Sequence, residues 1–168
     1  MGVAFGPPGQ VALCGNQTST WEINKGELLH TLPAFDSECL DEPPKIAFAA
    51  NGHVVIATKS PRSITIWDTE TGGEIQFLRL CDPGPSHIDS MAFSSNGILA
   101  ASNSSAIWIG SISKGSWIQK YSLPRHYSTN LDFDRSSGST LVTDFGVLGC
   151  NLEDTGKNGI LQLNLQDH

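Results

Sequence analysis

Residues 63–80, with the sequence SITIWDTETGGEIQFLRL, decide the fold. The stretch opens as a short run of apolar and β-branched residues that ends in Trp67-Asp68. It then passes through a turn at Thr71-Gly72 and continues as a second run. Two such runs separated by turn residues are typical of a β-hairpin. We expect the Trp67 ring to cover an apolar core and Asp68 to accept hydrogen bonds from the turn backbone, so the pair is interpreted as structural.

The same hairpin recurs along the chain. The segment TWEINKGELLHTL (20–32) aligns with IWDTETGGEIQFL (66–78), and in both a Trp is followed by a Gly five residues later. The third unit, WIGSISKGSWIQKYSL, keeps the turn Gly115, but its Trp108 comes two residues early. Because side chains alternate along a strand, this shift keeps the ring on the same face, one residue pair further back. The fourth unit, GVLGCNLEDTGKNGILQLNL, has no Trp.

A second motif precedes each hairpin. It reads apolar-x-Phe, turn-prone residues, a Gly and another apolar run, and it occurs as VAFGPPGQVAL (3–13), IAFAANGHVVI (46–56), MAFSSNGILAA (91–101) and LDFDRSSGSTLV (131–142). The separations between Phe5, Phe48, Phe93 and Phe133 are 43, 45 and 40 residues. A period of about 40–45 residues is that of a four-stranded propeller blade.

These residues resemble the WD40 repeat family. The resemblance is carried by Trp67-Asp68, by Thr71-Gly72 and by the AFxxxG openings at 47–52 and 92–97. It implies an all-β, WD40-like β-propeller with about four blades of four antiparallel strands. We expect one propeller region over residues 1–168, with blades at about 2–34, 44–82, 87–124 and 128–166.

Two family features are replaced in this chain. The family's Gly-His dipeptide is absent, and His87 is the nearest candidate for its His. The family's Asp in the second turn is replaced by residues near Arg62 and by Ser104 or Ser105. A narrower resemblance lies in LDFDRSSGSTLVTDFG (131–146), which looks like the closing region of the WD-repeat portion of fungal NACHT–WD proteins of the heterokaryon-incompatibility type. In that family the propeller is a C-terminal sensor attached to an ATPase. This chain contains no G-x-x-x-x-G-K-[ST] motif of such an ATPase.

Composition narrows the class of partner and the compartment. The net charge is −7 and the ten Lys and Arg residues are scattered, which argues against binding to nucleic acid or to anionic membranes. The sequence shows no secretory signal and no long apolar run. We interpret Cys14, Cys39, Cys81 and Cys150, which lack C-x-x-C spacing, as free thiols in a reducing, cytoplasmic setting. The five histidines lack metal-ligand spacing, so no metal or cofactor is expected.

Candidate contact residues lie in the connections between units. The loop AFDSECLDEPP (34–44) carries Asp36, Glu38, Asp41 and Glu42 with no basic residue. It is either a solvated loop that aids solubility or a patch for a basic protein partner, and it lacks the ligand alternation of a calcium site. His87 in DPGPSHID (82–89), with Arg125, His126 and Tyr127 in PRHYSTN (124–130), forms a second candidate set, or these loops simply cap the blades.

Three hypotheses for function follow. The leading one is a non-catalytic propeller segment that acts as a protein-interaction scaffold or sensor. A propeller enzyme would gather acids or metal ligands at the central channel, where the first strands are apolar apart from Asp132. The third is a truncated fragment of a larger WD-repeat signalling protein with no independent function. We also expect an open arc whose exposed end blades favour self-association through open edges.

Overall fold

The computed structural model describes residues 2–6, 8–15, 17–32, 45–49, 54–58, 63–80, 87–123, 130–134, 139–144 and 146–150, of which 54–58, 148 and 149 are described by their backbone alone. These residues form β-strands in repeated antiparallel sheets, so the all-β class is confirmed. Within this part of the chain, no helix has the length and hydropathy needed to cross a membrane.

The strands form sheets in chain order. The first sheet holds β1 (Gly2–Phe5), β2 (Gln10–Cys14), β3 (Thr18–Glu22) and β4 (Glu27–Leu32). The second holds β5 (Ile46–Phe48), β6 (Val54–Thr58), β7 (Ser63–Trp67) and β8 (Glu74–Arg79). The third holds β9 (Ser90–Phe93), β10 (Ile98–Ser102), β11 (Ala106–Ser111) and β12 (Ser116–Ser122). The fourth sheet contains β13 (Leu131–Phe133), β14 (Thr140–Thr143) and β15 (Gly146–Gly149) among the described residues.

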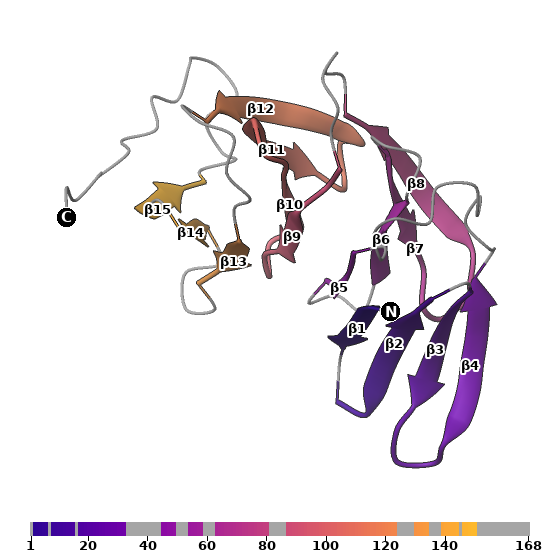
Figure 1. Cartoon of the computed structure of the whole chain (residues 1–168). Helices are drawn as coiled ribbons and strands as arrows, with labels where there is room; N and C mark the ends of the chain where they lie inside the picture. Colours follow the sequence, from indigo (N-terminus) through magenta and orange to yellow (C-terminus); the bar gives the residue numbers. More distant parts are fainter. Residues whose placement is uncertain are drawn as a thin grey trace.

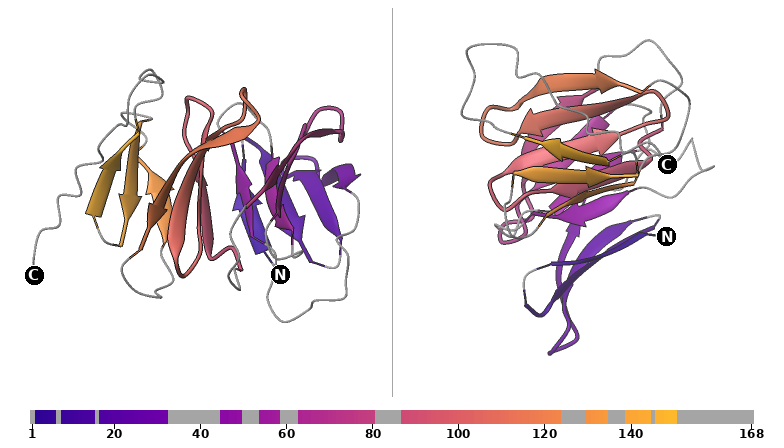
Figure 2. Two further views of the ribbon diagram at one scale, coloured as in Figure 1. Left: turned by 90° about the horizontal axis from the view of Figure 1, so that it is seen from above. Right: turned by 90° about the vertical axis from the view of Figure 1, so that its left-hand side faces the viewer.

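The four sheets are arranged as blades in an open arc. Their first strands, β1, β5, β9 and β13, lie along the inside of the arc, and each packs beside the next (Figure 1). Seen from above, the sheets stand side by side in chain order, with the first and fourth at the two ends (Figure 2). The expectation of a propeller-like arc is therefore confirmed.

The turn after Trp67 has the structure that the sequence predicts. Asp68 Oδ1 accepts hydrogen bonds from the backbone N–H of Glu70 at 2.7 Å and of Thr71 at 3.1 Å. Gly72 has a φ of 69° and donates its N–H to the Asp68 carbonyl at 2.8 Å. A positive φ is accessible to glycine without steric cost, which explains why this position of the repeat is a Gly.

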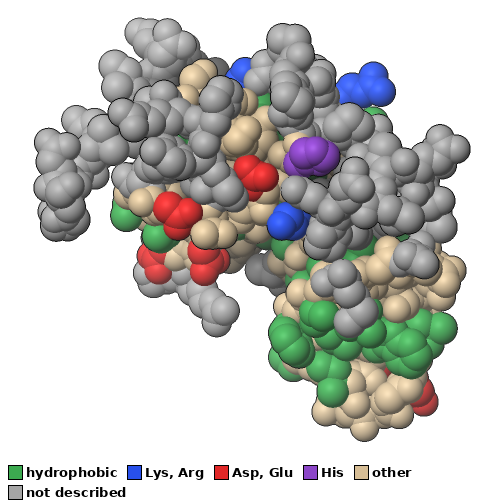
Figure 3. Space-filling model, viewed as in Figure 1, with side chains coloured by type: hydrophobic (Ala, Val, Ile, Leu, Met, Phe, Trp, Pro, Cys, Tyr) green, Lys and Arg blue, Asp and Glu red, His purple; other side chains and the backbone are tan. Residues whose placement is uncertain are grey.

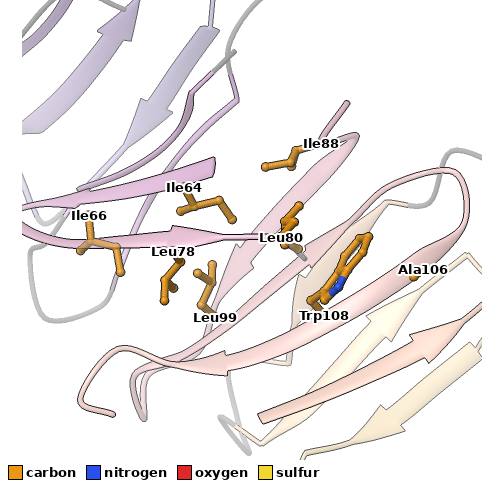
Figure 4. Close-up of a cluster of buried hydrophobic side chains, with 9 residues drawn as sticks. Ile64, Ile66, Leu78, Leu80, Ile88, Leu99, Ala106 and Trp108 are labelled. Atoms are coloured by element: carbon orange, nitrogen blue, oxygen red, sulfur yellow. The ribbon is translucent and has the colours of Figure 1, made fainter. Parts of the chain in front are cut away.

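Facing sheets are held together by apolar side chains. Between the second and third sheets, Ile64, Ile66 and Leu78 point toward Leu99 and Trp108 (Figure 4). The Trp108 ring is 3% exposed. It faces the preceding sheet, as Trp67 does from the second sheet, so the prediction from strand alternation is confirmed.

The third sheet fills the position of Trp67 in a different way. Gly110 pairs with Leu99 of β10, just as Trp67 pairs with Val54 of β6. The ring that covers this position is that of Trp117 on the neighbouring strand. It lies so close that a Cβ on Gly110 would be 2.9 Å from it. The indole N–H of Trp117 donates to the Arg79 carbonyl of the second sheet at 3.0 Å. The missing tryptophan is thus replaced across the strand pair.

Candidate functional site

A hollow in the described part of the chain lies where the inner strands of all four sheets meet. It has a volume of about 490 Å³. We call it the inner-strand pocket, and its walls include Phe5, Phe48, Met91, Phe93, Asp132, Phe133 and Asp134. The pocket therefore gathers residues that lie far apart in the sequence, because each inner strand contributes its last residues to the same place.

The four phenylalanines of the repeat provide the aromatic part of this pocket. Each ends an inner strand, and they range from Phe133, which is 4% exposed, to Phe5, which is 76% exposed. The residue after Phe5 must be small, because a Cβ on Gly6 would lie 2.6 Å from the ring of Phe48. The repeat motif thus sets both the position of the rings and the space between them.

Two carboxylates add negative charge to the pocket. Asp132 lies in the middle of β13 with an exposed side chain, and Asp134 follows the strand end. The backbone N–H of Asp134 donates to the Thr140 carbonyl at 2.8 Å, which fixes this end of the strand against β14. Aromatic faces beside carboxylates suit a cationic group that carries an apolar stem.

Strongly shifted ionisable groups lie at sheet interfaces. Burial raises the pKa of Cys150 to about 11 and that of Tyr121 to about 12. Burial also raises the pKa of Cys14, which its hydrogen bond with Thr18 partly offsets. The described residues contain no group of three or more His, Cys, Asp or Glu side chains able to hold a metal ion.

Of the residues proposed from the sequence, the structure describes His87 alone. His87 is exposed and directly precedes Ile88, which belongs to the core between the second and third sheets. The other seven lie outside the described residues, namely Asp36, Glu38, Asp41, Glu42, Arg125, His126 and Tyr127. Sequence reasoning recognised the repeated phenylalanines as a fold signal but missed their convergence. Their recurrence every 40 to 45 residues was the available signal, since equivalent positions of stacked repeats meet on one surface.

Asp144 and Gly146, from the tripeptide DFG at residues 144–146, have structural roles at the turn between β14 and β15. Asp144 Oδ2 accepts hydrogen bonds from the backbone N–H of Asn130 at 2.8 Å and from its side-chain amide at 3.2 Å. Gly146 has a φ of 133° at the start of β15. The carboxylate thus ties the start of the fourth sheet to the turn between its second and third strands.

Comparison with known proteins supports the fold. No family model matches the chain, and no curated protein matches its sequence. The structure is similar to the crystal structure of the computationally designed Ika4 protein, with a TM-score of 0.67 and 21% sequence identity over 89% of this chain and 90% of that chain. The fold is propeller-like. Because 892 chains of solved structures match, the architecture alone does not indicate a function.

Proposed function

We propose that the chain is a non-catalytic, WD40-like propeller segment that serves as a protein-interaction scaffold or sensor. In this proposal the inner-strand pocket receives a basic side chain of a protein partner. The observation that carries it is the meeting of four repeat phenylalanines with Asp132 and Asp134 in a pocket that all four sheets line.

The chemistry of the pocket favours arginine or lysine over other side chains. A guanidinium or ammonium group near Asp132 gains a charge-assisted hydrogen bond, and its aliphatic stem packs against the aromatic rings. Acidic side chains lie over the fourth sheet in the view of Figure 3, and the chain has a net charge of −7. This charge favours the approach of a basic segment. The acidic loop of residues 34–44 carries the same sign of charge.

Several observations support the finer parts of the proposal. The period of the repeat and the turn formed by Asp68 and Gly72 support a WD40-like propeller. The sequence of residues 131–146 supports a sensor segment like that of fungal NACHT–WD proteins. Cys14 and Cys150 are free and buried, which supports a reducing compartment such as the cytoplasm.

The test measures binding of a fluorescein-labelled peptide with one arginine between apolar residues. We expect Asp132→Asn to weaken binding about tenfold, equivalent to about 1.4 kcal/mol, because it removes the charge that faces the guanidinium. Binding should also weaken as salt is added, since an exposed pair is screened.

The matched control is Glu70→Gln, which removes one negative charge from the exposed β7–β8 turn, away from the inner-strand pocket. This variant should bind the peptide as the wild type does. An equal loss in both variants would assign the effect to net charge alone. A peptide with glutamine in place of arginine that binds equally well would contradict the proposal.

A further inference from the structure

Each sheet has two faces that can be distinguished by what covers them. We call the face toward the preceding sheet the back face and the face toward the following sheet the forward face. In the second, third and fourth sheets the repeat phenylalanines lie on the back face: Phe48 packs against the cluster that contains Ala12 of the first sheet, and Phe93 against the cluster that contains Ile64 of the second. Phe133 lies in the core shared by the third and fourth sheets.

The first sheet has a back face of the same design that no described sheet covers. The strand register places Phe5, Val11, Trp21 and Leu28 in one row across β1–β4. Phe5 is 76% exposed, Leu28 is 49% exposed, and Val3, in the neighbouring row, is 48% exposed. Hydrophobic side chains gather over the first sheet in Figure 3. This row corresponds to Phe48 and Trp67 in the second sheet, which are covered there.

The fourth sheet has the complementary exposed face. Its register aligns Asp132, Val142 and Val147 in one row on the side away from the third sheet. Val142 is 42% exposed and Val147 is 49% exposed. The forward faces of the first three sheets each cover a back face, so this row is the forward face left over at the other end of the arc (Figure 1).

We propose that the back face of the first sheet binds the forward face of the fourth sheet in a second copy of the chain. Within one chain the two faces lie at opposite ends of the arc (Figure 2). Between two copies the contact forms twice, so two arcs close into one ring. The contact continues the packing that the chain already makes three times, an aromatic back face against an aliphatic forward face. Phe5 and Asp132 belong both to these faces and to the inner-strand pocket, but the inference rests on strand register and exposure and does not require the proposed binding of a basic side chain.

The first measurement is the mass of the purified chain in solution by light scattering coupled to size-exclusion chromatography. We expect a discrete species with twice the mass of one chain. Val3→Lys on the first sheet and Val147→Glu on the fourth sheet each place a charge in the contact. Because both contacts of the ring contain both faces, each variant alone should dimerise at least tenfold more weakly.

Mixing the two variants separates this arrangement from others. One contact of the mixed pair is then free of both substitutions, and the other brings the introduced lysine and the introduced glutamate, of opposite charge, into the same contact. Dimers should therefore reappear with one copy of each variant, whereas a contact between two first sheets would give no recovery. The control is Ile118→Lys on β12, a residue that is 40% exposed on a sheet covered on both faces. It should leave the dimer unchanged.

Other results would overturn the proposal. A wild-type monomer would mean that the exposed faces receive something other than a second copy. Assemblies of varied and larger mass would mean that the contact does not close. A dimer that survives Val3→Lys and Val147→Glu would use another surface. Circular dichroism and thermal melting of each variant check that the sheets remain folded.

Discussion

The second sheet is packed differently on its two sides. Toward the first sheet it presents Trp67, whose buried ring lies in a cluster with the small residues Ala12 and Cys14. Toward the third sheet it presents branched aliphatic side chains, among them Ile64 and Ile66. Among the described side chains, the buried ring of the first interface is Trp67 of the second sheet, whereas the buried ring of the second interface is Trp108 of the third sheet.

This difference shows what the repeat requires. The third sheet has a glycine, Gly110, at the position equivalent to Trp67, and the ring of Trp117 from β12 lies over it. Trp108 faces the same interface from one residue pair further along β11. The interface is thus still occupied by tryptophan rings, although the contributing strand has changed. The repeat requires a large side chain between neighbouring sheets. Which position of the repeat supplies that side chain is less important.

The strongest test of this comparison is Trp67→Ala. The ring is 7% exposed, so its removal leaves a cavity in the cluster that it shares with Ala12 and Cys14. We expect the free energy of unfolding to fall by about 3–5 kcal/mol, as measured by chemical denaturation. The control is Ile66→Val in the second interface, for which we expect a loss of about 0.5–1.5 kcal/mol. A loss below about 1 kcal/mol for Trp67→Ala would contradict the burial of this ring in the first interface.

The sequence predicted the parts of the fold that depend on local spacing. The period of the phenylalanines, the positive φ of Gly72 and the hydrogen bonds of Asp68 all follow from patterns within one hairpin. It also predicted the face of Trp108, because alternation along a strand is local.

The parts that could not be predicted depend on contacts between strands or units. The replacement of a tryptophan at Gly110 by Trp117 needs the register of β11 and β12, including the bulge between Ile109 and Gly110. A second example is the β10–β11 turn, where Ser104 or Ser105 was expected in place of the family's Asp. The acceptor is the buried Asn103, whose Oδ1 binds the backbone N–H of Ser105 at 2.9 Å and of Ala106 at 2.8 Å.

The candidate site was less predictable than the fold. The inner-strand pocket forms from residues about one unit apart, so nothing within a single unit marks it. Asp134 illustrates the point, because it follows Phe133 where the other units have Gly6, Ala49 and Ser94. In the sequence Asp134 looks like one more turn residue. Only the arrangement of the sheets shows that it lines the same pocket as the four phenylalanines. Sequence reasoning instead favoured the connecting loops, because charged residues that cluster there are neighbours in the sequence itself.

A smaller effect is expected from Gly110→Ala, which tests the replacement across strands. In an ordinary strand this change is favourable, because alanine loses less conformational entropy than glycine on folding. Here the new Cβ would lie 2.9 Å from the Trp117 ring, so the ring or the strand must shift. We expect a loss of about 1–3 kcal/mol in the free energy of unfolding.

A double-mutant cycle assigns this loss to the ring. In a Trp117→Leu background the added methyl group no longer meets the indole, so Gly110→Ala should cost less there than in the wild type. A cost that is unchanged by Trp117→Leu would place the strain elsewhere in β11 and would contradict the replacement of the missing tryptophan by Trp117.

The smallest expected effect is a pH dependence that comes from thiols in two of the interfaces. Cys14 is fully buried beside Trp67, and burial raises its pKa above the ordinary value of 9.0 despite a hydrogen bond to Thr18 Oγ1 at 3.0 Å. Burial raises the pKa of Cys150, between the third and fourth sheets, from 9.0 to about 11. In both cases the folded chain holds the proton more tightly than the unfolded chain does.

The sign of the effect follows from this difference. Well below pH 9.0 both thiols are protonated in both states, and their full contribution to stability is present. As the pH rises above that value the unfolded chain releases its thiol protons first, so the free energy of unfolding falls, for Cys150 until about pH 11. Denaturation at several pH values should therefore show a shallower decline in Cys14→Ala and in Cys150→Ala than in the wild type. A decline that Cys150→Ala reduces and Cys14→Ala does not would mean that water reaches Cys14 in the folded chain, and that the Trp67 ring does not seal the first interface.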